Sequence, residues 1–178
     1  MFNRSFFLLR FAAFLLPAIL FAQAAAQPDL AFTAADGRPV DLAKMRGKVV
    51  LLDFWATWCG PCIAELPHVT AAYRKFHDQG FEVVGISLEN AHLYRSDTPE
   101  QRTQKLMRAK KTLLEFTAAH DMPWPQFFDG EFWDGPLVKK FGVTGVPAMF
   151  LLDRDGTVVS GDLQGRELDA AVRKRLQP

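Results

Sequence analysis

A continuous apolar run that leads into a Cys-x-x-Cys motif constrains this chain more than any other feature. Residues 49–54 read Val-Val-Leu-Leu-Asp-Phe, the pattern of a central strand covered on both faces. Cys59 and Cys62 come next, and residues 60–77 carry apolar side chains at helical spacing. Pro61 suits the first turn of this helix, where a missing N–H costs nothing. The sequence therefore predicts a cysteine pair at the junction between a buried strand and a helix.

After the N-terminal hairpin, predicted strands and helices alternate along the chain, and a second predicted β-hairpin follows them. Asp36-Gly37 predicts a turn between two short strands, and Thr98 to Gln101 has the form of a capping box that opens a helix ending near residue 119. Alternation gives parallel strands and a late hairpin adds antiparallel ones, so we expect an α/β fold with a central mixed β-sheet flanked by helices and an N-terminal β-hairpin extension. The other expected strands are 30–34, 39–42, 81–87, 148–152 and 157–160, and the other expected helices are 135–141 and 167–176.

The first 26 residues have the layout of a secretory signal peptide. Arg4 and Arg10 precede a short apolar stretch at residues 11–22, which is followed by small residues in an A-x-A cleavage pattern. The alternative is a retained membrane anchor, but a helix that spans a bilayer needs roughly 20 apolar residues. We therefore expect residues 1–26 to be removed on export and residues 27–178 to form one domain.

Charge and cysteine content exclude several classes of protein. The 21 basic and 20 acidic residues nearly cancel and form no basic block, which argues against a nucleic-acid partner. The chain has 2 cysteines, and a loop as short as theirs adds little stability when it is closed. Structural zinc usually takes four ligands, and the histidines show no H-x-x-x-H spacing, so we expect no metal and no other cofactor. The histidines are His68, His77, His92 and His120.

The position of the cysteine pair predicts thiol–disulfide exchange. A helix N-terminus stabilises a thiolate through its unpaired N–H groups and its dipole. Cys59 occupies that position and is expected to be the exposed attacking thiol. Cys62 lies one turn deeper and is expected to resolve a mixed disulfide by attacking Cys59. Trp58 is expected to shield the pair.

Two carboxyl groups are candidates for moving a proton to and from the dithiol. Asp53 lies inside the apolar run, where burial of a lone carboxylate is costly unless its pKa rises. The alternative is an aspartate at a partly hydrated strand end. Glu65 lies one turn after Cys62 on the same helical face, and its alternative is a solvated helix glutamate.

Two further segments extend the set of candidate surfaces. Residues 90–111 exceed what a minimal fold needs, so they either shape a partner surface or lengthen a helix. Residues 124–130, together with Trp133, are unusually aromatic. We expect these rings to pack between helix and sheet, with a recognition surface as the alternative.

Two motifs resemble those of the thioredoxin superfamily. Residues 51–62, LLDFWATWCGPC, resemble its active-site segment, and residues 142–147, GVTGVP, resemble its second signature. Pro67 matches the proline that kinks the active-site helix. The signal peptide, the leading hairpin and Glu65 resemble the TlpA/ResA branch of exported thioredoxin-like proteins, although many members of that branch carry Asn where this chain has Asp53. The similarity spans roughly residues 28–177.

The resemblance implies a thioredoxin fold and a periplasmic thiol:disulfide oxidoreductase. It implies that the Val146–Pro147 bond is cis and that its backbone groups hold the partner's chain beside the dithiol. Trp58, Gly60 and Pro61 would complete this substrate-binding surface.

The dipeptide between the cysteines, as in reducing thioredoxins, favours a reductant of exported proteins, for example in cytochrome c maturation. Electrons would come from a membrane thiol donor, and we expect a monomer. The alternatives are a periplasmic disulfide oxidase or isomerase, a peroxiredoxin-like peroxidase, whose P-x-x-x-T/S-x-x-C pattern is not matched, and a copper-carrying assembly factor that binds metal through the two thiolates.

Overall fold

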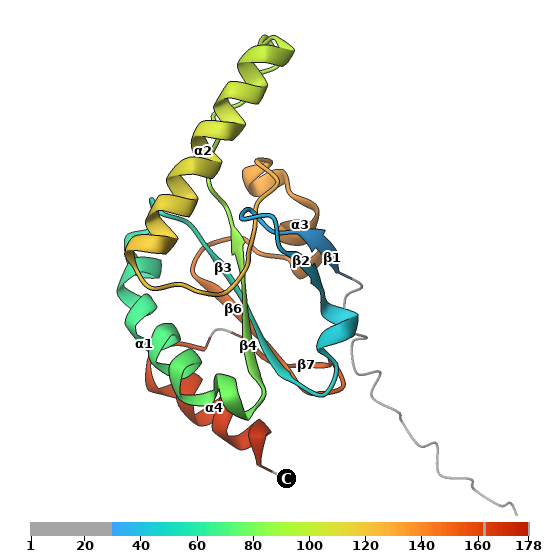
Figure 1. Ribbon diagram of the computed structural model, residues 1–178, viewed down its shortest axis with the longest axis vertical. Helices are drawn as coiled ribbons and strands as arrows, with labels where there is room; N and C mark the ends of the chain where they lie inside the picture. Colours follow the sequence, from blue (N-terminus) through green and yellow to red (C-terminus); the bar gives the residue numbers. More distant parts are fainter. Residues whose placement is uncertain (1–29, 162, 178) are drawn as a thin grey trace, which may run out of the picture.

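The main sheet is organised around β3 (Val49–Trp55), a strand that is buried along its whole length. The computed structural model describes residues 30–161 and 163–177 (Figure 1), so the predicted signal peptide lies outside the described residues. In the sheet, β3 pairs in parallel with β4 (Phe81–Ser87) and antiparallel with β6 (Ala148–Leu152). The outer strands are β5 (Gln126–Phe127) and β7 (Val158–Gly161), and the strand order is β5-β4-β3-β6-β7. The predicted central mixed sheet is therefore confirmed.

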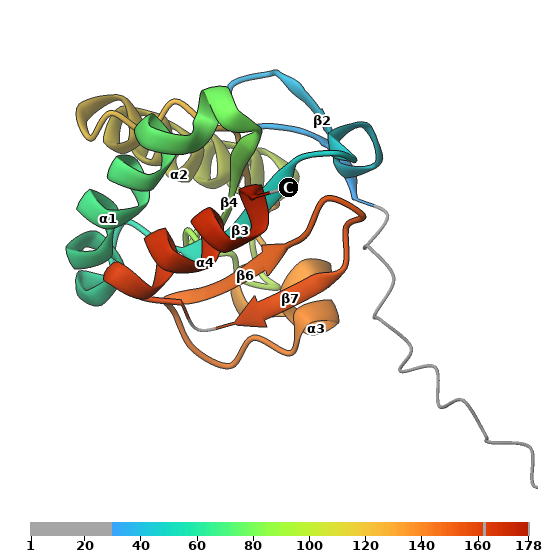
Figure 2. The same ribbon diagram turned by 90° about the horizontal axis from the view of Figure 1, so that it is seen from below.

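Helices α1 (Gly60–Phe76) and α4 (Arg166–Leu176) pack against each other on one side of the sheet (Figure 2). On that side the charge of Glu65 in α1 acts on Asp53 in β3. Successive side chains of a strand point to opposite faces, so Phe54 points to the other face.

The short helix α3 (Pro136–Phe141) covers that other face through Phe141, whose ring centroid lies 5.4 Å from that of Phe54. Helices therefore flank the sheet on both sides, as predicted.

Helix α2 (Pro99–Ala119) begins at the predicted capping box, in which Thr98 and Gln101 exchange side-chain-to-backbone hydrogen bonds. Its buried residues lie at Ala109, Leu113 and Thr117, whereas residues 99–104 are exposed on every side. The first half of α2 consequently projects beyond the end of the sheet (Figure 1).

The N-terminal hairpin of β1 (Ala31–Thr33) and β2 (Pro39–Asp41) forms a separate two-stranded sheet, as expected. The backbone N–H of Ala35 donates to the carbonyl of Gln126 at 2.8 Å, which fastens the hairpin to β5. Three 3-10 helices complete the described elements: η1 (Leu42–Met45), η2 (His77–Gln79) and η3 (Phe132–Asp134).

Candidate active site

Cys59 is the N-cap residue of α1 and forms a disulfide with Cys62, with the two Cα atoms 5.2 Å apart. The backbone N–H of Cys62 donates to Sγ of Cys59 at 3.1 Å. Pro61 occupies the first turn and removes an N–H that would otherwise lack a helical partner. The sulfur of Cys59 therefore faces a backbone donor and the positive end of the helix dipole, both of which stabilise a thiolate.

The exposure of the pair differs from expectation. Cys59 was expected to be exposed, but in the disulfide form Cys59 is 4% exposed and Cys62 is 3% exposed, so both residues are buried. Both residues are enclosed because the sulfur of Cys59 accepts a hydrogen bond from the helix and is bonded to the sulfur of Cys62. The two cysteines are distinguished by their positions on α1, since Cys59 precedes the first turn and Cys62 lies within it.

Trp58 stands beside Cys59 as an exposed aromatic residue, with 47% of its surface accessible. Its indole N–H donates to the carbonyl of Leu88 at 3.1 Å, and its ring centroid lies 5.7 Å from Phe132 and 6.5 Å from Trp133. We call Trp58, Phe132 and Trp133 the aromatic shelf. The expectation of internal packing holds for Trp124, which is 1% exposed, and the partly buried Phe127, Phe128 and Trp133 also pack against the hydrophobic core. Trp133 and its neighbour Phe132 contact the exposed Trp58 as well.

Asp53 is the buried carboxyl group predicted within β3, with 2% exposure. Among the described residues, its Oδ1 has no hydrogen-bond partner. Burial, together with the nearby negative charge of Glu65, raises the pKa of Asp53 to about 7. The site therefore contains a carboxyl group that gains and loses a proton near neutral pH.

Glu65 is half-buried and connects α1 to the start of α4. Its Oε2 accepts a hydrogen bond of 2.8 Å from the backbone N–H of Gly165, the N-cap residue of α4. Gly165 has a φ of 55° and a ψ of −126°, a backbone conformation that side chains disfavour. The carboxylate thus fixes a helix terminus and also acts electrostatically on Asp53.

The Val146–Pro147 bond is cis, as the resemblance implied. Ala148, the next residue, pairs with Phe54 near the C-terminal end of β3. Pro147 therefore lies at the same end of the sheet as the segment that leads from β3 to Cys59. A cavity of about 430 Å³ opens along this loop. Its lining includes residues 142–148, Phe150 and Gly161.

Glu89 is a buried carboxylate that the sequence analysis missed. It is 7% exposed, and its Oε2 accepts hydrogen bonds from the backbone N–H and the hydroxyl of Thr57 at 3.2 and 2.8 Å. These bonds hold the loop that immediately precedes Trp58 and Cys59. The available signal was an acidic residue directly after the apolar strand at 81–87.

Residues 24–160 match the model of a known protein family, the AhpC/TSA family. The chain belongs to this family. It is similar to the thiol-disulfide oxidoreductase ResA of Bacillus thuringiensis subsp. konkukian (strain 97-27), with 25% identity over 150 residues that cover 84% of this chain and 74% of that protein.

Two solved structures share the architecture. One is the thioredoxin domain of a thiol-disulfide oxidoreductase from Bacteroides vulgatus, with a TM-score of 0.64, 24% identity, and coverage of 86% of this chain and 97% of that one. The other is a thiol:disulfide interchange protein of the thioredoxin family from Chlorobium tepidum TLS, with a TM-score of 0.67, 21% identity, and coverage of 88% and 99%. This member of the AhpC/TSA family is therefore a thiol-disulfide oxidoreductase with the thioredoxin fold.

Within residues 30–161 and 163–177, no group of three or more His, Cys, Asp and Glu side chains is placed to hold a metal ion. In the same ranges, no helix has the length and apolar character needed to cross a membrane.

Proposed function

We propose that this oxidoreductase reduces disulfides in exported proteins, with Cys59 as the attacking thiol and Cys62 as the resolving thiol. The observation that carries this assignment is the helix-cap geometry, in which Sγ of Cys59 accepts the N–H of Cys62 at 3.1 Å. A reduced Cys59 retains that donor and the helix dipole, so its thiolate is stabilised before attack.

The proposed reaction transfers two electrons from the dithiol to the substrate. The Cys59 thiolate attacks one sulfur of the substrate disulfide, which forms a mixed disulfide and releases one substrate thiolate. Cys62 then loses its proton and attacks Sγ of Cys59, which releases the second substrate thiolate and closes the Cys59–Cys62 disulfide. Asp53 receives the proton of Cys62, because its pKa of about 7 leaves part of the population ionised at neutral pH. Each released substrate thiolate takes up a proton from water.

The substrate-binding surface is proposed at the cis-proline loop and the first turn of α1. Val146 and Pro147 line the cavity of about 430 Å³, and the backbone of this loop would hold an extended segment of the partner. Gly60 is exposed in the first turn, and a Cβ built there meets no other heavy atom within 4 Å. Pro61 and Trp58 are exposed beside it, so a partner chain can approach the sulfur of Cys59 on this side.

The proposed cellular location, electron donor and substrate class rest on the amino-acid sequence. Residues 1–26 would direct export to the periplasm, and residues 27–178 would act there as a monomer. A membrane thiol donor would return the disulfide to the dithiol, and apocytochrome c cysteines are the proposed substrate class. The Gly60-Pro61 dipeptide supports the reducing direction, as in thioredoxin, whose potential is about −270 mV against about −120 mV for the oxidant DsbA.

The test is the equilibrium of the purified protein with reduced and oxidised glutathione, combined with an insulin-reduction assay. We expect a potential closer to about −270 mV than to about −120 mV and reduction of insulin.

The variant Cys62→Ser should trap mixed disulfides on Cys59 in the native host. A potential near that of DsbA would instead favour the oxidase or isomerase alternative. Rapid peroxide consumption would favour a peroxiredoxin-like peroxidase. Tight copper binding without insulin reduction would favour a copper-carrying assembly factor.

A further inference from the structure

The loop and helix that project beyond the sheet, residues 90–108, are held largely by polar contacts, and Ala91 is the apolar side chain among them that is buried. We call this segment the arm. Nζ of Lys105 donates to both carboxylate oxygens of Asp97, at 2.7 and 2.8 Å, and to the carbonyl of His92 at 3.0 Å. The backbone N–H of Tyr94 donates to Asp97 at 2.7 Å, and Lys105 lies 4.5 Å above the ring of Tyr94. A helix half that is exposed on all sides is marginal in water by itself, so this network accounts for its order.

A cleft of about 490 Å³ separates the arm from residues 130–134. The two sides approach closely at Gly130, where an added Cβ would collide with Leu106 of the arm. Phe132 lines the cleft and also packs on Trp58, which directly precedes Cys59. Phe132 therefore belongs both to the lining of the cleft and to the aromatic shelf beside the dithiol.

Two residues in the cleft lining have unusual backbone conformations. His92 has a φ of 50° and Phe132 has a φ of 55°, and they are two of the three described non-glycine residues with positive φ. Such conformations persist only where the surrounding structure imposes them. The walls of the cleft are consequently held in a defined shape.

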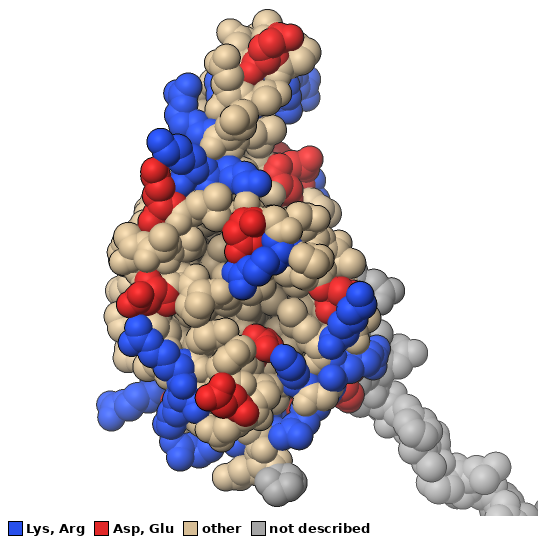
Figure 3. All heavy atoms as spheres, viewed as in Figure 1, with Lys and Arg blue, Asp and Glu red and all other residues tan. Residues whose placement is uncertain are grey.

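The charges of the cleft favour an acidic occupant. The arm carries four basic and two acidic side chains, and Figure 3 shows basic side chains on the projecting part. Arg95 and Arg102 line the cleft, and within the described part of the chain Arg95 has no hydrogen bond or ion pair. On the opposite wall, Asp134 is paired with Lys139 at 3.3 Å, which leaves Glu131 as the facing carboxylate.

We propose that this cleft binds an acidic, extended segment of the protein whose disulfide is reduced. The inference rests on the proposed function and deepens it by naming the substrate class. An apolar side chain near the substrate disulfide lies on the aromatic shelf, and acidic side chains further along the segment face Arg95 and Arg102. The arm thereby selects among disulfide-containing proteins by charge, through contacts separate from the dithiol chemistry.

Two synthetic peptides provide the test. Each carries one internal disulfide next to a tryptophan, and the chain then continues with aspartates in one peptide and with lysines in the other. The reduced protein is mixed with each peptide, and the rate of disulfide reduction is measured beside the rate with oxidised glutathione. We expect the double variant Arg95→Glu/Arg102→Glu to lose about tenfold in rate with the aspartate peptide, beyond any change with glutathione. The lysine peptide should react faster with this variant than with the wild type, and both effects should weaken with salt.

The matched control is Arg108→Glu/Lys110→Glu, which makes the same change in charge at exposed positions of α2 that do not line the cleft. If both double variants lose rate equally, the effect belongs to overall charge and the cleft proposal is wrong. Equal losses with both peptides would also overturn it, and circular dichroism identifies a loss caused by unfolding of α2. A wild-type protein that reduces neither glutathione nor the peptides would contradict the proposed function itself.

Discussion

At the scale of single residues, Asp53 combines a structural cost with a chemical use. It lies in a strand whose other side chains are apolar, and its pKa of about 7 results first from burial and then from the charge of Glu65. Near neutral pH the carboxyl group is present in both protonation states, which suits transfer of a proton to and from the dithiol. The same raised pKa makes the stability of the folded protein depend on pH.

Replacement of Asp53 by Asn should remove this pH dependence. The carboxyl group has a pKa of about 7 in the folded protein, against an ordinary value of 3.8. Between these values the folded state binds more protons than the unfolded state, so its stability falls as pH rises. The stability of the wild type relative to Asp53→Asn should decrease by about 4 kcal/mol between about pH 4 and about pH 8. Urea unfolding of the oxidised proteins measures this difference, and a difference that is constant with pH would contradict the raised pKa.

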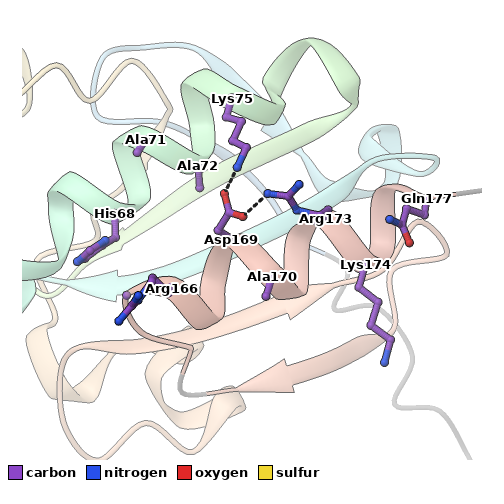
Figure 4. Close-up of a pocket in the computed structure, with 11 residues that line it drawn as sticks. His68, Ala71, Ala72, Lys75, Arg166, Asp169, Ala170, Arg173, Lys174 and Gln177 are labelled. Carbon is purple, nitrogen blue, oxygen red and sulfur yellow. Dashed lines mark hydrogen bonds and ion pairs between the residues drawn. The ribbon is translucent and has the colours of Figure 1, made fainter.

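At the scale of secondary-structure elements, α1 and α4 are joined at two places. Glu65 of α1 accepts the N–H of Gly165 at the start of α4, and Lys75 of α1 forms an ion pair with Asp169 of α4, which also pairs with Arg173 of its own helix (Figure 4). The ion pairs are partly exposed and contribute little, about 0–1 kcal/mol each. The hydrogen bond from Gly165 to Glu65 is half-buried and satisfies a backbone donor. It therefore contributes more than the ion pairs of Asp169 to holding α4 in position.

Two substitutions of Glu65 separate its structural effect from its electrostatic effect. Glu65→Gln keeps an oxygen that can accept the Gly165 N–H, whereas Glu65→Ala removes the acceptor and should cost about 1 kcal/mol of stability. Both variants remove the negative charge, so both should lower the pKa of Asp53. NMR titration of the Asp53 carboxyl carbon and urea unfolding provide the two measurements. If the pKa of Asp53 stays unchanged in both variants, the electrostatic link between the two carboxyl groups is wrong.

At the scale of the whole molecule, Gln126 joins three parts of the fold. Its backbone belongs to β5 at the edge of the main sheet, and its carbonyl accepts the N–H of Ala35 from the hairpin segment. Its side-chain Oε1 accepts the indole N–H of Trp55 at 2.9 Å, at the end of the central strand. The hairpin, the sheet edge and the strand that leads to the dithiol therefore meet at one buried amide.

Replacement of Gln126 by Met should destabilise the molecule by about 1–3 kcal/mol, because it leaves the buried indole N–H of Trp55 without an acceptor. Gln104→Met is the matched control, since Gln104 is exposed on α2, and it should change stability by less than about 0.5 kcal/mol. Urea unfolding compares the two variants. Equal stability of Gln126→Met and the wild type would show that the Trp55 hydrogen bond contributes nothing.

The sequence predicted the parts of this fold that have strong periodic signals. The apolar run of β3, the helical spacing of α1, the capping box of α2 and the hairpin turn all act over short distances along the chain, and each is found in the structure. Strand β5 was missed because it has 2 residues, too few to show any alternation. Glu89 was missed because its burial depends on Thr57, a partner 32 positions away.

The Cys-x-x-Cys motif and its position before a helix were determined by sequence alone, since the N-cap geometry depends on neighbouring residues. Four features were decided only by the tertiary structure: the burial of both cysteines, the contact of Glu65 with Gly165, the packing of Trp58 on Phe132 and Trp133, and the cleft beneath the arm. The physical reason is distance along the chain. Local patterns select helices, turns and strands, whereas burial and charge at a site depend on residues that only the completed fold brings together.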